Sequence, residues 1–353
     1  MGVVTPVTSE TARRAARSGT GLIAVLAVVT FGAAPARTVE SPRSIAWARL
    51  RNPILGYRDR AVKDPAVVWA PGRWQALFSL VTPAGQWRIG SATSADLSRW
   101  SPRGELPHDA AVEGEASPDV VPTPDGSSFV VTYQSFVHDQ TGSQPKLYYR
   151  TTSDFRRYSP ARPLGLELHP AAADRMIDAA VAWTPAGLLL GYKYGRTDGV
   201  QAFELARSST GSLDGPWRLL GRPDISVYSD TIENYQFLHL GGGWQLLATS
   251  NRLDRPFLFT LAGDPTTPGG WLHWSGGREL HVPQERWNPG RGATGATYEH
   301  ANCAFVVDRQ PLGGRVYLVY ADAPEVRRFG GAGHDQLALA RSGDLVHWSL
   351  PPR

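Results

Sequence analysis

Three carboxylates in this chain each stand at the start of a short apolar run of β-strand type. They are Asp64 in residues 63–69, Asp178 in residues 176–183 and Glu233 in residues 231–237. A glycine-containing turn follows each run, and a second apolar segment follows each turn. An unpaired carboxylate is costly to bury. Three of them at the same place in three similar units therefore indicate that internal symmetry gathers them at one site.

Carboxyl groups gathered in one narrow cavity could perform general acid and base catalysis. The group that gives a proton needs a raised pKa, which a neighbouring negative charge supplies. The group that takes a proton must stay ionised near the operating pH. Three carboxylates around one axis meet these demands together.

The elements that would position these groups recur along the chain. Past residue 48 the pattern is almost entirely of β type. The segments 91–100, 150–158 and 339–348 share a strand of small residues, a turn containing Asp, an apolar residue and then an aromatic residue. Pairing each apolar start with such an ending gives five units, at approximately 60–103, 113–160, 173–219, 228–280 and 296–350.

Repeats of about 40–50 residues with four strands each are typical of a β-propeller. We therefore predict an all-β fold, a single five-bladed β-propeller over residues 59–353. The first strand of each blade would line the central channel, which brings distant residues together at one end of the axis. The second and fifth units would contribute Asp119 and His300, each placed ahead of an apolar strand.

Composition bounds the class of protein. With 353 residues and 42% hydrophobic content, the chain can build a large core in one large domain or two ordinary ones. The net charge is +4, but the body of the chain carries no run rich in Lys and Arg. We therefore do not expect nucleic-acid binding. The single cysteine, Cys303, lies in an apolar run, so we expect a buried thiol.

The N-terminus has the pattern of an export signal. Arg13, Arg14 and Arg17 precede an apolar stretch over residues 21–31, and the Ala-Pro-Ala sequence ending at Ala36 resembles a cleavage site. The stretch is shorter than the roughly 20 residues that cross a membrane, although an uncleaved anchor is the alternative. We predict a signal peptide at 1–36, a linker and lead-in at 37–58, and a secreted or extracytoplasmic protein.

The order of the short motifs resembles that of the five-bladed propeller glycoside hydrolases. Family 43 is the nearest, with families 62 and 32 as relatives. The resemblance covers essentially the whole mature chain, and the order and spacing of the motifs carry it. The motifs are Asn52-Pro53-Ile54-Leu55, Asp64-Pro65, Ser117-Pro118-Asp119-Val120, Ile177-Asp178, Glu233 and His300.

The resemblance implies a role for each residue. Asp64 matches the general base, Glu233 the general acid, and Asp178 the aspartate that tunes the pKa of the acid. Asp119 matches an aspartate of the substrate pocket. His300 matches a histidine near the axis that lies beside a calcium ion or water in many relatives, so we expect no required cofactor but allow a structural Ca²⁺ in the channel. Tyr235, like Trp69 and Trp287, could offer a flat face to a sugar ring.

These roles predict a glycosidase that inverts the configuration of a furanoside, of arabinofuranosidase or arabinanase type, acting on a carbohydrate as a monomer. Inversion requires the two carboxyl groups to lie about 6.5–9.5 Å apart. The family usually follows the acid with Gly-Pro, whereas this chain has Asn234-Tyr235. That departure motivates an alternative, a propeller that binds a glycan or a protein without catalysis. A third hypothesis is retaining transfer on fructosides, with Asp64 as the nucleophile.

Local alternatives also remain open for single residues. Asp64-Pro65 and Ser117-Pro118-Asp119 are also turn signals, and an Asp before a strand often caps backbone amides. His300 could be a core histidine with a backbone partner. Glu299, directly before it, is a competing candidate for the acid.

Overall fold

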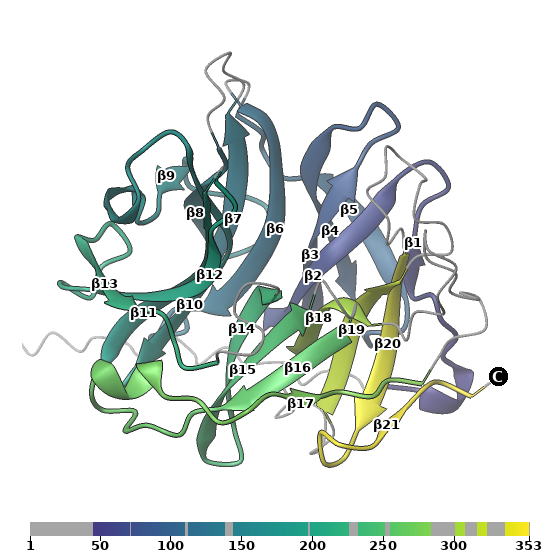
Figure 1. Cartoon of the computed structure of the whole chain (residues 1–353). Helices are drawn as coiled ribbons and strands as arrows, with labels where there is room; N and C mark the ends of the chain where they lie inside the picture. Colours follow the sequence, from purple (N-terminus) through teal and green to yellow (C-terminus); the bar gives the residue numbers. More distant parts are fainter. Residues whose placement is uncertain are drawn as a thin grey trace, which may run out of the picture. The chain divides into compact units, whose positions relative to one another are not determined.

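The described part of the chain folds into five antiparallel sheets that follow one another around a central axis (Figure 1). All of these residues belong to one compact unit, residues 39–353. The computed structural model describes residues 45–70, 72–109, 112–137, 144–196, 198–225, 232–250, 255–283, 301–307, 316–322 and 336–352. The predicted all-β, five-bladed propeller is confirmed.

The first four blades are four-stranded meanders in which each strand pairs with the next one along the chain. Blade one contains β2 (Ala61–Ala70), β3 (Arg73–Val81), β4 (Trp87–Ser94) and β5 (Trp100–Glu105). Blade two contains β6 (Val112–Pro122), β7 (Phe129–Val137), β8 (Lys146–Thr152) and β9 (Arg162–Pro163). Blade three contains β10 (Asp174–Thr184), β11 (Gly187–Arg196), β12 (Gln201–Ser208) and β13 (Trp217–Gly221). Blade four contains β14 (Ile232–Leu240), β15 (Gly243–Ser250), β16 (Arg255–Thr260) and β17 (Arg278–Glu279).

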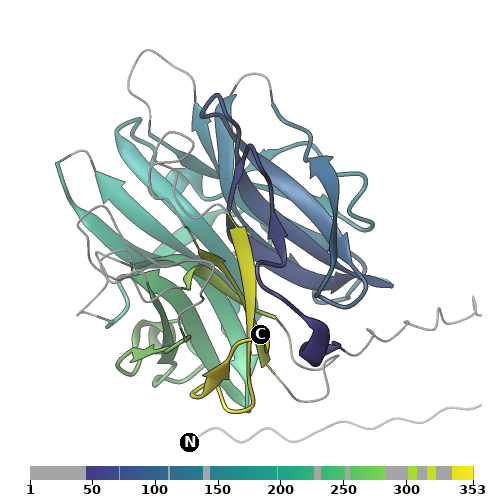
Figure 2. The same cartoon turned by 90° about the vertical axis from the view of Figure 1, so that its right-hand side faces the viewer.

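Blade five combines strands from both ends of the chain. Its inner strands are β18 (Asn302–Val307), β19 (Val316–Asp322) and β20 (Gln336–Ser342), and β20 pairs with both β1 (Leu55–Gly56) and β21 (Trp348–Ser349). Figure 2 shows the lead-in beside the C-terminal strands. The N-terminal strand therefore closes the ring against the last blade.

The lead-in is part of this closure. Asn52 extends the pairing of β1, because its Oδ1 accepts a hydrogen bond from the backbone N of Leu339 at 2.9 Å and its Nδ2 donates to the Leu339 carbonyl at 3.1 Å. Trp47, in the 3₁₀ helix η1 (Trp47–Arg49), is buried and lies edge-on to Tyr317. Within the predicted linker and lead-in at residues 37–58, the side chains of Trp47, Leu50, Ile54 and Leu55 are buried in the propeller.

The hydrophobic core lies between neighbouring blades, in four clusters of buried side chains. One cluster joins blade one to blades two and five, and the others join blades two to three, three to four and four to five. Because the stabilising apolar burial occurs between the faces of the sheets, the inner strand of each blade can carry polar residues at the channel mouth.

The repeated blade endings are Asp-stabilised turns. Asp96, Asp154 and Asp344 each accept hydrogen bonds at one carboxylate oxygen from the backbone N atoms two and three residues later. This is the local bonding that makes Asp a turn residue. The next residue in each, Leu97, Phe155 or Leu345, has a positive φ. The motif therefore shapes the turn to the last strand of a blade.

Two further 3₁₀ turns are present, η2 (Leu166–Leu168) and η3 (Gly269–Leu272). Among the described residues, none of the helices has the length and apolar character needed to cross a membrane.

The closure by Asn52 can be tested by substitution. We expect Asn52→Ala to lower the free energy of unfolding by about 1–3 kcal/mol, because it leaves the backbone N and O of Leu339 without their side-chain partner. Urea denaturation followed by tryptophan fluorescence measures this. Arg49→Ala, at an exposed position of the same lead-in, is the matched control and should change stability little. Equal stability of the two variants would show that the lead-in does not close the ring.

Candidate functional site

The inner strand of every blade breaks its pairing at the same place. The register between the first and second strands shifts after Lys63, Ala116, Ile177, Glu233 and Asn302. The residue that follows each break has a positive φ of 49–55°, namely Asp64, Ser117, Asp178, Asn234 and Cys303. A β-bulge that contains a left-handed residue bends the strand and re-aims a side chain. One such residue from each blade therefore lies at the mouth of the channel.

These positions are strained. None of the five residues is glycine, and a left-handed conformation costs about 1–2 kcal/mol for a residue with a Cβ. Strained non-glycine residues cluster at functional sites, where the surrounding structure holds them in place. The repetition in all five blades makes the ring a property of the fold, and the residue types in it are specific to this chain.

The ring corrects one detail of the sequence analysis. The repeat was expected to place Asp64, Asp178 and Glu233 at the same position of three blades. Asn234 occupies that position in blade four, and Glu233 lies one residue earlier, at the position of Lys63 and Ile177. A shift of one residue in a strand turns the side chain toward the other face, so the environment of Glu233 differs from that of the two aspartates.

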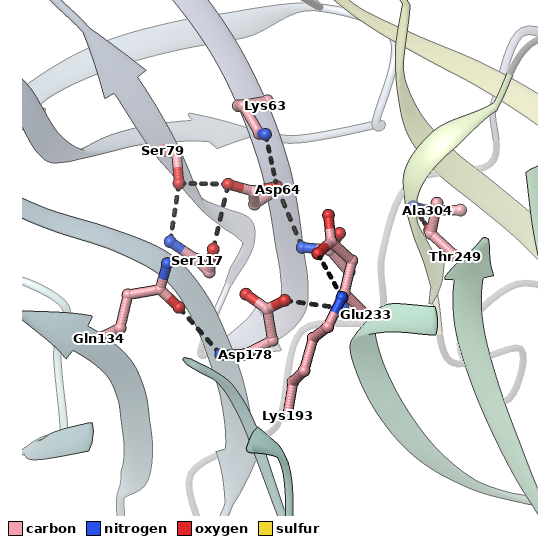
Figure 3. Close-up of polar contacts among 11 residues, drawn as sticks. Lys63, Asp64, Ser79, Ser117, Gln134, Asp178, Lys193, Glu233, Thr249 and Ala304 are labelled. Carbon is pink, nitrogen blue, oxygen red and sulfur yellow. Dashed lines mark hydrogen bonds and ion pairs between the residues drawn. The ribbon is translucent and has the colours of Figure 1, made fainter. Parts of the chain in front are cut away.

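Asp64 receives hydrogen bonds from three blades (Figure 3). Its Oδ2 accepts from the hydroxyl of Ser79 at 2.5 Å and from that of Ser117 at 3.3 Å. Its Oδ1 accepts from the side-chain Nδ2 of Asn234 at 3.0 Å, and the ammonium of Lys63 lies 3.8 Å from the same oxygen. This buried carboxylate is therefore held in one orientation by neighbours on every side.

Lys63 supports the charge of that carboxylate. Burial by itself would lower the pKa of Lys63, but the charge of Asp64 and those of other nearby groups outweigh it and hold this pKa above its ordinary value. The lysine is therefore a positive charge beside Asp64 throughout the physiological range.

Asp178 lies beside Asp64, and Asn234 contacts both. Asp178 Oδ2 accepts a hydrogen bond from the backbone N of Asn234 at 3.3 Å, and its own backbone N donates to Gln134 Oε1 at 2.9 Å. The side chain is buried, with 4% of the residue exposed. Burial, followed by the charges of Glu233 and Asp64, raises the pKa of Asp178 to about 7. This carboxyl can therefore hold a proton close to neutral pH.

Glu233 contacts a buried lysine. Lys193 Nζ, from β11, lies 3.3 Å from Glu233 Oε2, and Figure 3 shows this pair beside Asp178. The three carboxylates predicted from the sequence thus come together from blades one, three and four. Two lysines that the sequence analysis did not select accompany them.

A second set of polar residues ties the inner strands of blades two, three and five to the preceding blade. Ser79 Oγ accepts from the backbone N of Ser117 at 2.7 Å, and Thr249 Oγ1 accepts from that of Ala304 at 3.4 Å. Gln134 makes the same contact to Asp178. All three residues lie on the second strand of their blade, where each pairs with the residue just before the bulge of the first strand.

Sequence reasoning missed these residues because it aligned only the first strand of each unit. The available signal was a polar residue toward the end of each apolar second strand, opposite the first strand's polar start: Ser79, Gln134, Lys193 and Thr249.

All five ring residues line a hollow of about 20 Å³, together with Asp119. This volume is enough for about one water molecule. Asp119 is buried, with 6% of the residue exposed, and its Oδ1 has no hydrogen-bond partner among the described residues. Burial raises the pKa of Asp119 to about 7. Asp119 therefore lies inside the channel mouth next to the catalytic candidates.

Cys303 occupies the fifth place in the ring and lines the same hollow. Burial, and next the charge of Asp64, raise the pKa of its thiol well above the ordinary value. A thiolate is the reactive form of cysteine, so Cys303 is not a nucleophile near neutral pH. The expectation of a buried thiol is confirmed.

Tyr235, which the sequence suggested as a flat platform for a sugar ring, lines the same hollow but is almost fully covered. Only 4% of it is exposed, its ring packs on Phe203 with centroids 4.2 Å apart, and its hydroxyl donates to the Ile232 carbonyl at 2.7 Å. The bulge turns it into the core between blades three and four. Trp69 stands at the far end of β2, against Trp74.

His300, Glu299 and Trp287 lie outside the described residues. Within the described ranges, no three His, Cys, Asp or Glu side chains are grouped so that they could hold a metal ion. A calcium ion near His300 therefore stays a prediction.

The bridging role of Asn234 can be separated from its backbone strain. Asn234→Gly and Asn234→Ala both remove the amide that donates to Asp64, but glycine adopts a positive φ without penalty. We expect the alanine variant to be less stable than the glycine variant by about 1 kcal/mol, measured by denaturant unfolding. An alanine variant as stable as the glycine variant would contradict the strained bulge.

The buried Asp119 predicts a pH-dependent stability. Because its folded pKa is raised to about 7, its protonated form is favoured by folding, and this stability is full below pH 4 and is lost as the pH rises to 7. Asp119→Asn lacks this dependence, so its stability relative to the unmodified protein should rise by up to about 4 kcal/mol between pH 4 and pH 8. Urea denaturation at several pH values measures the difference. The exposed Asp59→Asn should show no such trend.

The sequence matches no family model and no curated protein. The fold, in contrast, matches many solved structures. The α-L-arabinofuranosidase from Lactobacillus brevis is 14% identical, with a TM-score of 0.60, over 86% of this chain and 98% of that one. A family 43 endo-arabinanase from Bacillus licheniformis is 12% identical, with a TM-score of 0.53, over 81% of this chain and 95% of that one.

A family 32 β-fructofuranosidase from Bombyx mori is 14% identical, with a TM-score of 0.58, over 81% of this chain and 61% of that one. Identities this low establish the fold alone. The resemblance drawn from the sequence is thus confirmed at that level: the chain has the five-bladed propeller fold that these glycoside hydrolases share.

Proposed function

We propose that this protein is a glycoside hydrolase that cleaves furanosidic bonds with inversion, as arabinofuranosidases and arabinanases do. The observation that carries the proposal is the convergence of Asp64, Asp178 and Glu233 from three blades at one mouth of the channel, linked through Asn234. The fold supports it, since the Lactobacillus brevis and Bacillus licheniformis proteins that share it are an α-L-arabinofuranosidase and an endo-arabinanase.

In the proposed reaction Asp64 is the general base. It takes a proton from a water molecule, whose oxygen forms a bond to the anomeric carbon from the face opposite the leaving group. The fixed hydrogen bonds from Ser79, Ser117 and Asn234 orient the Asp64 carboxylate for this step. Positioning of this kind supplies much of the rate enhancement in enzymes.

Glu233 is the general acid, which donates a proton to the glycosidic oxygen as its bond to the anomeric carbon breaks. Asp178 tunes this step. Neighbouring carboxylates cannot both ionise freely, and the charge of Glu233 contributes to the raised pKa of Asp178. We infer that Asp178 keeps a proton beside Glu233 close to neutral pH.

The Lys193 contact also favours a second candidate function. A lysine fixed 3.3 Å from Glu233 can neutralise this carboxylate and keep it from acting as an acid. In that case the protein is a propeller that binds a glycan without cleaving it. Retaining transfer on fructosides, with Asp64 as the nucleophile, is the other mechanism that this fold could host, as the similarity to the Bombyx mori enzyme suggests.

We further propose that the protein acts outside the cytoplasm as a monomer, after cleavage of a signal peptide near Ala36, and that it requires no cofactor. The pattern of basic and apolar residues before Ala36 supports the export.

The test is turnover of a panel of nitrophenyl furanosides and pyranosides. We expect Asp64→Asn and Glu233→Gln to lower kcat by about 10²–10⁴, the usual contribution of one acid or base. Asp125→Asn, in an exposed turn, is the matched control and should keep full activity. No turnover on any substrate, together with glycan binding, would support the binding function instead.

The pH dependence of kcat/KM tests whether Asp178 must hold a proton during the reaction. Since the pKa of Asp178 is raised to about 7, kcat/KM should fall about tenfold per unit as the pH rises beyond 7. Asp178→Asn should displace this alkaline limb. The anomer released first, followed by NMR, separates inversion from retention, and a retained product would contradict the inverting mechanism.

A further inference from the structure

A second hollow, of about 780 Å³, lies between blades one and two. It is formed by the hairpin that joins β3 to β4 and by the first residues of β6, with Phe136 near the end of β7. The pairing registers place these strand ends beside the start of β2, the strand that carries Asp64. The hollow therefore opens at the same end of the propeller as the carboxylates.

Two aromatic rings form a wall of this hollow. Trp87 and Phe136 are both partly exposed, with ring centroids 6.3 Å apart and planes inclined by 35°. Each comes from a different blade, so the wall spans the boundary between them. Partly exposed aromatic rings offer flat apolar surfaces.

The boundary beneath the rings is held closely together. Arg88 Nη1 donates to the carbonyl of Trp87 at 2.7 Å and to that of Glu113 at 3.1 Å. At Gly114 a Cβ would lie 3.0 Å from the Cβ of Trp87, so the absence of a side chain there admits this approach. Polar side chains surround the aromatic wall, with His108 on one side and the exposed Gln86 and Glu113 at the rim.

The hollow is connected to the carboxylates by one residue. Lys63 Nζ lies 5.6 Å from the centre of the Trp87 ring and 3.8 Å from Asp64 Oδ1. A ligand that lies on Trp87 is therefore separated from the proposed base by a single side chain.

We propose that this hollow binds a further sugar unit of the glycan whose glycosidic bond is cleaved at Asp64. The substrate is then an oligosaccharide or polysaccharide rather than a single terminal glycoside. This inference rests on the proposed function. A sugar ring has an apolar face of C–H groups, which can pack on the aromatic wall of the hollow. It also has hydroxyl groups around its edge, which can form hydrogen bonds with the polar rim. The volume lies within the range of known small-molecule sites.

The experiment compares a short with a long probe. The short probe is nitrophenyl α-L-arabinofuranoside, and the long probes are linear arabino-, xylo- and manno-hexaoses. Turnover is measured on the unmodified protein, Trp87→Leu and Gln86→Ala, and binding of the hexaoses is measured by titration calorimetry on the same proteins. Trp183→Leu, at the far end of blade three, is the matched control for loss of a partly buried tryptophan. Thermal denaturation of each variant separates loss of binding from loss of folding.

We expect Trp87→Leu to weaken binding of one hexaose about tenfold and to lower turnover of the short probe much less than turnover of that hexaose. Gln86→Ala, which removes only an exposed rim contact, should weaken hexaose binding less than Trp87→Leu does. Equal losses on short and long probes would overturn the proposal, as would no loss in either variant or no binding of any hexaose. If no probe is cleaved but Trp87→Leu still weakens binding of a hexaose, the proposed hydrolysis fails and the sugar site stands.

Discussion

The left-handed bulge in the first strand of each blade is the constraint on which the site depends. A strand that stayed regular would alternate its side chains between the two faces of the sheet, and no residue would turn toward the axis at the channel mouth. The bulge interrupts that alternation in all five blades. The cost of five strained residues is offset by the cores between the blades and by the polar contacts that hold each bulge against its neighbour.

The same geometry explains why the five positions are chemically unequal. The fold supplies a ring, but the residues in it are two aspartates, a serine, an asparagine and a cysteine. Asp64 is surrounded by hydrogen-bond donors, whereas burial, followed by the charges of Glu233 and Asp64, raises the pKa of Asp178 to about 7. Two carboxyl groups in equivalent backbone positions thus have different surroundings, and acid and base catalysis requires carboxyl groups whose environments differ.

Closure of the ring gives these small differences a fixed frame. The hydrogen bonds between blades hold neighbouring inner strands at a fixed distance as long as closure of the ring keeps the blades together. Pairing of β1 with β20, extended by Asn52, joins the first described segment to the last blade. The hollow next to Trp87 depends on the same frame, because it exists only while blades one and two stay in contact through Arg88.

The sequence by itself predicted five blades, because pairing the apolar strand starts with the blade endings gives five units. The endings around Asp96, Asp154 and Asp344 are turns held by local hydrogen bonds. The sequence also identified Asp64, Asp178 and Glu233, because a carboxylate ahead of an apolar strand stands out. Only the tertiary structure showed that Asn234, and not Glu233, occupies the same register position as Asp64 and Asp178. It also showed that Lys63 lies beside Asp64 and that Lys193 lies beside Glu233. A bulge shifts the pairing register by one residue, and this shift depends on the partner strand. The neighbours that a residue receives from another blade depend on closure of the ring. No local sequence pattern encodes either of these.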